Sequence, residues 1–281
     1  MGKLIQYCTK ASKFDGEFAW QAAGMGYLIF TEENSLIVID GGTCPEDTQN
    51  LLRIMEDASH GIPRVKLWIL THPHFDHYAA LLELAKSPAD RARVEIDTLC
   101  YCNPNSFTWI KRGTQYDAKK DLEAVDSIAN MLSCRVLRPK SGDRLDIDGT
   151  TVEFLYTYEN AETLADPNEL SLVFTVTGKH KKAMFTGDAY SAGLEVVYKT
   201  YKDRPDILRS DIVQIAHHGL NGGHTLFYKL VDADVALVPI SRSGDRAMLR
   251  PEENCAHHNL YAEARAHSVI KAYCGTAALE F

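Results

Sequence analysis

The stretch Ile69–Ala80, "ILTHPHFDHYAA", places three histidines and one aspartate within six positions. The apolar run "VKLWIL" leads into it, and the helix-like segment "YAALLELA" overlaps its end. His72 and His74 are two positions apart, so both project to the same side of an extended segment. Asp76 and His77 follow as the chain turns into the helix. Because imidazole and carboxylate groups are ligands for zinc and its first-row neighbours, the stretch predicts a metal site. A polar helix-capping loop would account for Asp76 alone.

Three other apolar segments end in side chains that can bind a metal. "SLIVIDGG" carries Asp40, "KAMFTGD" ends in Asp188, and "DIVQIAHHG" carries His217 and His218. Each has a glycine nearby, which lets the chain turn tightly. A strand-end aspartate alone is weak evidence, because turns favour aspartate in any case. Together with the histidine cluster, these residues indicate one site assembled from several strand ends.

Composition and charge narrow the class of protein. The chain has 281 residues, 45% hydrophobic and 24% charged, as in an ordinary soluble globular protein. The formal charge of −8 offers no electrostatic footprint for nucleic acid, so we expect no nucleic-acid partner. The N-terminal segment lacks the apolar core of a signal peptide, and no run approaches the ~18 apolar residues of a membrane span. Seven cysteines without a C-x-x-C pair are read as free thiols of a reducing compartment. We therefore expect a cytoplasmic protein.

Hydrophobic patterning predicts strands and helices interleaved along the whole chain. Strands are expected at 27–31, 35–40, 65–70, 95–101, 143–147, 151–158, 170–176, 182–188, 211–216, 235–240, 269–273 and 278–281. Helices are expected at 45–59, 78–85, 117–133, 190–201, from 225 onward and at 257–267. Clustered strands with helices on both sides fit two sheets packed face to face with helices outside, as one α/β domain over residues 1–281.

These motifs resemble those of a known family. "HPHFDH" is similar to the H-x-H-x-D-H signature of the metallo-β-lactamase superfamily, and "LIVIDGG", "FTGD" and "IAHHG" resemble its other motifs in the same order. The resemblance extends from about Gly24 to Phe281. It implies a four-layer αββα sandwich with two divalent first-row metal ions at one edge, zinc first and manganese or iron as alternatives. By matching position it implies His72 and His74 on one metal, Asp76, His77 and His217 on the other, Asp188 bridging both, and Asp40 orienting the ligands.

One position departs from the family pattern. Many members carry another histidine between the cluster and the bridging aspartate, where this chain has only His180. Eight residues of strand at ~3.3 Å each put His180 roughly 25 Å from Asp188, too far for a ligand. In its place "ADPNELSLVF" is similar to the asparagine-containing segment of a subgroup that includes phosphorylcholine esterases and the DNA-uptake competence protein's domain. We therefore expect Asn168 near the site as a hydrogen-bond donor to water or substrate, and weaker binding of the first metal.

The metal site implies a reaction class. Two cations ~3.5–4 Å apart lower the pKa of a bound water, hold the resulting hydroxide and neutralise charge on the attacked group. We predict a metal-dependent hydrolase acting on a phosphoester or phosphodiester of modest size. A lactonase, thioesterase or amide hydrolase on the same metals is the alternative, and an iron redox enzyme a more distant one. Asp76, His218 and Asn168 are the predicted catalytic groups. The histidine of the 217/218 pair that does not bind metal would donate a proton or contact substrate; the family's spacing favours His217 as the ligand.

Substrate determinants are less well marked. The segment "PISRSGDRAMLRPEEN" carries Arg242, Arg246 and Arg250, which would grip an anionic small molecule if they face the site. A solvated surface loop is the alternative. The segment 103–116 is read either as a lid or as a packed loop. His224 is expected to cap a helix, and His257 and His258 to lie at the surface. The sequence does not indicate an oligomeric state.

Overall fold

The first sheet contains strands from both ends of the chain. The computed structural model describes residues 2–17, 24–59, 61–103, 108–109, 118–158, 163–164, 166–248 and 256–281. The strand order is β17-β1-β2-β3-β4-β6-β8, and the short β5 also pairs with β4. The strands are β1 (Lys3–Gln6), β2 (Gly26–Phe30), β3 (Leu36–Asp40), β4 (Arg64–Ile69), β5 (Glu95–Ile96), β6 (Thr98–Cys100), β8 (Arg135–Leu137) and β17 (Ala277–Glu280).

The second sheet is built from the second half of the chain. Its order is β16-β15-β14-β13-β12-β10-β9. The strands are β9 (Arg144–Ile147), β10 (Thr150–Tyr156), β12 (Val173–Thr177), β13 (Lys182–Phe185), β14 (Ile212–Gln214), β15 (Val235–Val238) and β16 (Ser268–Lys271). Two further short strands, β7 (Thr108–Trp109) and β11 (Thr163–Leu164), pair with each other in parallel.

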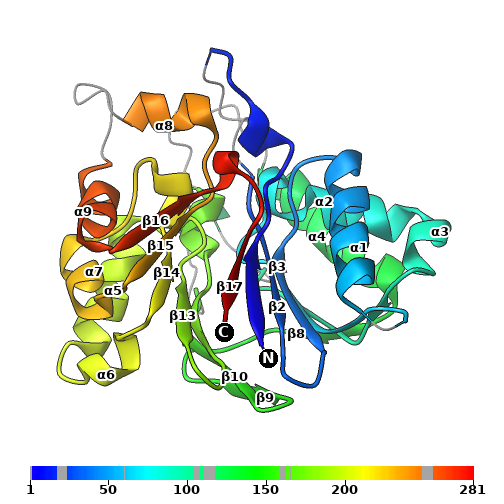
Figure 1. The fold of residues 1–281 in the computed structure, drawn as a ribbon, viewed down its shortest axis with the longest axis horizontal. Helices are drawn as coiled ribbons and strands as arrows, with labels where there is room; N and C mark the ends of the chain where they lie inside the picture. The colour runs from blue at the N-terminus through cyan, green and yellow to red at the C-terminus, as the bar shows by residue number, and fades with distance from the viewer. Residues whose placement is uncertain are drawn as a thin grey trace.

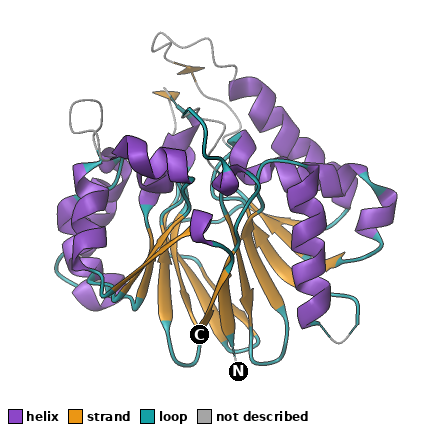
Figure 2. Cartoon of the chain, turned by 45° about the horizontal axis from the view of Figure 1, so that its top comes forward, coloured by secondary structure: helices purple, strands orange, loops and turns teal. Residues whose placement is uncertain are grey.

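Helices lie on the outer side of each sheet, so the molecule has four layers (Figure 1 and Figure 2). The first sheet is flanked by α1 (Pro45–Ala58), α2 (Phe75–Lys86), α3 (Pro88–Arg91) and α4 (Ala118–Leu132). The second is flanked by α5 (Ser191–Tyr201), α6 (Pro205–Leu208), α7 (Thr225–Val231) and α9 (His257–Arg265), while α8 (Arg242–Met248) lies beyond the carboxyl end of β15, at the top in Figure 1. This is the αββα sandwich that the motifs predicted. None of the described helices is long and apolar enough to cross a membrane.

Side chains alternate between the two faces of each strand, and the buried apolar ones form three hydrophobic clusters. In β2, Leu28 and Phe30 pack toward the helices, whereas Tyr27 and Ile29 join the cluster between the two sheets. Successive strand residues point to opposite faces, and a sheet covered on both sides must be apolar on both. This explains why all five residues of β2 and of β3 are buried. The cluster between the sheets holds residues of both halves, so it joins them.

Most of the predicted elements are present, but several features differ, and the short helices α3, α6 and α8 were not expected. The expected strand 95–101 is two strands, β5 and β6, with Asp97 between them donating its N–H to the carbonyl of Val65. The strands β1 and β8 were not expected. The C-terminal strand β17 crosses to the first sheet and pairs antiparallel with β1, Lys3 lying opposite Glu280. Both ends of the chain therefore lie at the same side of the molecule (Figure 1).

Candidate metal centre

The predicted site residues come from the carboxyl ends of strands in both sheets. Asp40 is the last residue of β3, and His72 and His74 follow β4, its parallel neighbour. Asp188 follows β13, and the two histidines 217 and 218 follow β14, which is parallel to β13. Parallel neighbours bring their carboxyl ends to one edge of a sheet, so each half delivers its polar side chains to the same edge of the sandwich.

Two groups of side chains in the described residues are arranged to hold a metal ion. In the first-site group, His72, His74 and Asp188 offer ligand atoms within 4.8 Å of one another. The second-site group consists of Asp76, His77, Asp188 and His218, under the same limit. Asp188 belongs to both. Its Oδ2 lies 3.8 Å from His72 Nε2, 3.3 Å from His77 Nε2 and 3.2 Å from His218 Nε2.

The atoms that face one another here lack hydrogen-bond partners. Within the described part of the chain, His77 Nε2, His218 Nε2 and Asp188 Oδ1 are buried and make no hydrogen bond. Buried polar atoms are almost always paired, because leaving one unpaired costs about 1–3 kcal/mol. Imidazole nitrogens and a carboxylate oxygen in one small space are the donor set that first-row divalent cations prefer. The residues therefore fit the two metal ions that the motifs predicted.

Hydrogen bonds on the far side of each imidazole fix its orientation. Asp40 Oδ2 accepts from His77 Nδ1 at 2.8 Å, and both Asp40 oxygens also accept from Thr71, one from its N–H and one from its hydroxyl, each at 2.8 Å. His218 Nδ1 donates to the carbonyl of Pro239 at 2.8 Å. With Nδ1 carrying the proton, Nε2 of each ring presents its lone pair to the site. Asp40 is thus placed to orient the His77 imidazole.

The backbone around the site is strained. Asp40, His217 and His218 have positive φ angles of 55°, 47° and 56°. Such a conformation costs about 1–3 kcal/mol per residue and tends to occur where function requires it. Gly187 in "FTGD" has φ +52°, and a Cβ there would lie 3.0 Å from Thr71 Cβ. Only glycine lets β13 turn this close to the end of β4, which brings Asp188 to the histidines.

Burial and charge set the protonation of the ligands. Burial alone would lower the pKa of His218, but the carboxylates of Asp188 and Asp76 outweigh it and raise that pKa to about 10. The pKa of His77 is likewise raised well above its usual value, burial being outweighed by Asp188, Asp40 and Asp76. Burial would raise the pKa of Asp188, yet His218 and His77 hold it well below its usual range. Without metal, the second-site group therefore holds protons that a cation must displace.

The structure places His218, and not His217, within the second-site group. The sequence favoured His217 as the ligand and His218 as the catalytic group. In the structure His218 Nε2 lies 3.0 Å from Asp76 Oδ2, inside the second-site group, and His217 belongs to neither group. His217 Nδ1 donates to the carbonyl of Asn221 at 2.6 Å, which turns its Nε2 to 3.9 Å from Asp188 Oδ2. Burial lowers the pKa of His217, so this imidazole is neutral near pH 7.

Asn168 lies beside the site and is hydrogen-bonded to Tyr190 and Asp166, two residues that the sequence did not single out. It sits in a 3-10 helix, Pro167–Leu170, just before β12, and its side chain is 3% exposed. Its Nδ2 is 2.9 Å from Tyr190 Oη and 3.5 Å from His217 Nε2. Tyr190 Oη donates in turn to Asp166 Oδ2 at 3.1 Å. Tyr190 follows Asp188 by two residues, and Asp166 precedes Asn168 by two residues. Their closeness in sequence to predicted site residues is the only feature of the sequence that could have pointed to them.

The remaining histidines that the structure describes belong to neither metal group. His180 is exposed in the turn between β12 and β13, at the opposite end of β13 from Asp188. His224 caps α7, its Nδ1 accepting the N–H of Phe227, as predicted. His257 is exposed and His258 half-buried.

The predicted substrate arginines are engaged with an acidic residue. Arg246 Nη1 lies 2.5 Å and Arg242 Nε 3.9 Å from the carboxylate of Asp15, and both arginine side chains are more than half exposed on α8. These contacts fit the solvated-surface alternative better than a grip on substrate. Arg250 and most of the segment 103–116, including its proposed role as a lid, lie outside the described residues.

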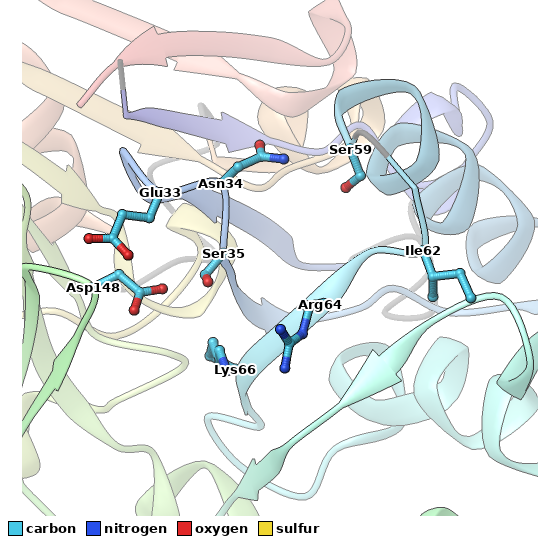
Figure 3. A pocket seen from close by; sticks show the side chains of 8 residues that line it. All are labelled: Glu33, Asn34, Ser35, Ser59, Ile62, Arg64, Lys66 and Asp148. Atoms are coloured by element: carbon cyan, nitrogen blue, oxygen red, sulfur yellow. The ribbon is translucent and has the colours of Figure 1, made fainter.

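A hollow of about 410 Å³ lies elsewhere on the surface (Figure 3). Ser35, which lines it, precedes β3, whereas Asp40 ends that strand, about 17 Å away at ~3.4 Å per residue. Its two cationic side chains already have partners: Lys66 pairs with Asp97 and Arg64 with Glu95. The hollow is therefore separate from the metal groups and offers no free positive charge.

Solved structures share this fold at low sequence identity. YhfI from Bacillus subtilis, a metallo-β-lactamase fold protein, is 14% identical with a TM-score of 0.58, over 99% of this chain and 100% of that one. Zn²⁺-bound PqqB from Methylobacterium extorquens is 10% identical with a TM-score of 0.57, over the whole of both chains. CmlA from Streptomyces venezuelae, a diiron β-hydroxylase, is 11% identical with a TM-score of 0.58, over 99% of this chain but 54% of its own. A search of curated protein sequences found no match.

Of these similar structures, PqqB is described as Zn²⁺-bound and CmlA as a diiron enzyme. Identities this low show the fold alone. A sequence model of the metallo-β-lactamase superfamily matches residues 23–217, more than half of the chain and the part that carries every predicted ligand up to His217. The chain belongs to the metallo-β-lactamase superfamily, and it has the metal-dependent hydrolase fold that its motifs predicted.

Proposed function

We propose that this protein hydrolyses a phosphoester or phosphodiester of modest size, using two divalent cations. The observation that carries the proposal is the pair of ligand groups that share Asp188. His72, His74 and Asp188 would hold one cation, and Asp76, His77, Asp188 and His218 the other. Bound there, two cations would lower the pKa of a water molecule and neutralise charge on the attacked group. Zinc is the first choice for the metal, with manganese or iron as alternatives.

The charge of the ligand set supports an anionic substrate. The two groups contain two carboxylates, Asp76 and Asp188, against the four positive charges of two divalent cations. The imidazole ligands are neutral once they bind metal, so two positive charges remain uncompensated among the ligands themselves. A phosphodiester is already anionic before it is attacked and becomes more so, so it benefits from that excess more than a neutral lactone does. The engaged arginines of α8 add nothing to this balance, because Asp15 already pairs with them.

Side chains that bind no metal complete the proposed mechanism. His217 is neutral, and because its Nδ1 proton is held by the carbonyl of Asn221, its Nε2 lone pair faces the site. When its 3.5 Å contact with Asn168 Nδ2 opens, this lone pair can accept a proton from water and return it to the leaving-group oxygen. Asp40 holds His77 in place throughout.

A substrate panel tests the proposal. The protein is loaded with Zn²⁺ or Mn²⁺ and offered bis(4-nitrophenyl) phosphate, a chromogenic lactone and a chromogenic thioester. We expect turnover of the phosphodiester, loss of that turnover in Asp188→Asn, and no loss in Asp148→Asn. The control makes the same chemical change in the turn between β9 and β10, at the hollow far from the metal groups. Hydrolysis of the lactone or thioester without the phosphodiester would favour the alternative substrate class, and no hydrolysis by any loaded form would contradict the proposal.

A further inference from the structure

The side-chain amide of Asn168 has an oxygen with no partner. Asn168 Oδ1 is buried and makes no hydrogen bond within the described part of the chain. The nitrogen of the same amide is 2.9 Å from Tyr190 Oη and 3.5 Å from His217 Nε2. An amide can donate two hydrogen bonds and accept two, so this one uses its donors and leaves its acceptor unused. A buried unused acceptor beside a set of metal ligands calls for an explanation.

The chemistry of its neighbours determines which way the amide points. A carboxylate only accepts hydrogen bonds, so the single proton of Tyr190 Oη goes to Asp166 Oδ2, 3.1 Å away. Tyr190 Oη can then only accept from Asn168, which requires the nitrogen of the amide on that side. On the other side, His217 carries its proton on Nδ1 and offers a lone pair at Nε2, which again favours nitrogen. Nitrogen and oxygen of an amide are hard to tell apart by shape, but here the hydrogen-bond polarity distinguishes them.

Asp166 ties this arrangement to the first-site group. Its Oδ1 accepts the backbone N–H of Asn168 at 2.9 Å, which fixes the start of the 3-10 helix. The same Oδ1 lies 3.8 Å from His74 Nε2, a member of that group. One carboxylate therefore holds the backbone of Asn168 directly, holds its side chain through Tyr190, and reaches a histidine of the first site.

We infer that Asn168 Oδ1 is an oxygen ligand of the first site, with Tyr190 and Asp166 as positioning residues that turn the oxygen inward. It joins His72, His74 and Asp188 where many family members have a third imidazole. The sequence prediction for Asn168, a hydrogen-bond donor, is the reverse of this role. Replacing an imidazole by an amide oxygen makes the first site harder than a site with three imidazoles, so it favours Mn²⁺ relative to Zn²⁺ more than such a site would. The inference rests on the metal binding of the proposed function and is independent of which bond is hydrolysed.

Metal titrations of three variants test it without any substrate. Zn²⁺ or Mn²⁺ alone is titrated into the metal-free protein against a chromophoric chelator, giving separate affinities for the two sites. Asn168→Leu removes the oxygen, Asn168→Asp keeps an oxygen but removes the N–H donors, and Tyr190→Phe frees the amide to rotate. Tyr198→Phe removes a hydroxyl within α5, the helix that Tyr190 precedes as N-cap, from a ring that packs against His224, and serves as the matched control.

The inference predicts a distinct pattern of affinities. Asn168→Leu and Tyr190→Phe should each weaken the first site by about 10- to 100-fold while leaving the second within about threefold, and Asn168→Asp and Tyr198→Phe should keep the first site. In the wild type, the ¹⁵N signal of the Asn168 side-chain amide should shift when the first site fills. Equal weakening by Asn168→Asp and Asn168→Leu would show that the donors matter and overturn the inference. So would a Tyr190→Phe protein that melts earlier but binds both cations normally. Because no substrate is present, a failed phosphodiesterase assay would not affect this result.

Discussion

Replacing His218 by alanine should remove one of the two cations. In the structure its Nε2 lies 3.0 Å from Asp76 Oδ2 and 3.2 Å from Asp188 Oδ2, which makes it one of four ligands of the second site. Four-ligand zinc sites bind with about 10–16 kcal/mol, so an equal share per ligand is about 2.5–4 kcal/mol. At about 1.4 kcal/mol per factor of ten, His218→Ala should weaken the second site roughly 10²- to 10³-fold.

The matched variant is His217→Ala, which deletes the same ring one residue away. After dialysis against a metal buffer that keeps the wild type at two cations per chain, His218→Ala should retain one and His217→Ala two, as measured by elemental analysis. His217→Ala should lose turnover without losing metal, because we assign it proton transfer only. If His217→Ala lost a cation while His218→Ala kept both, the reasoning from side-chain geometry would be refuted and the order favoured by the family's spacing restored.

Three further predictions follow from the same contacts. Asp40→Asn should weaken the second site about 10- to 100-fold, because the carboxylate that orients His77 loses its charge, and chelator competition would detect it. The metal-free protein should lose stability as the pH rises from 6.5 to about 10, because His218 keeps its proton in the folded state after the unfolded chain has released it. The affinity for cations should rise over the same range. Thermal melts and metal titrations across a pH series check both. Gly187→Ala should destabilise the fold by about 1–3 kcal/mol in denaturant unfolding, since its φ of +52° and the nearby Thr71 leave no place for a Cβ.

The pattern of apolar residues predicted the strands, because the burial of each strand determines its own residues. A strand covered on both faces reads as an apolar run, and its polar end marks the edge of the sheet, which is how Asp40 and Asp188 could be found. The sequence could not separate His217 from His218, because the choice depends on left-handed backbone angles and on carbonyls elsewhere in the chain. Tyr190 was missed for a similar reason. Its role depends on a hydrogen bond to a side chain 24 residues away, which no local pattern encodes.

Because both sheets share one edge, cations bound at the proposed sites would cross-link the two halves of the chain. Residue 72 comes from the first half of the chain and residue 188 from the second, and a cation held by both closes the loop between them. Closing a long loop removes entropy from the unfolded chain, as a disulfide does, but here the closure is reversible and depends on free metal concentration. The two halves should then unfold as one unit when metal is plentiful and more independently when it is scarce. Metal supply would therefore set how long the folded molecule survives, as well as whether it can work.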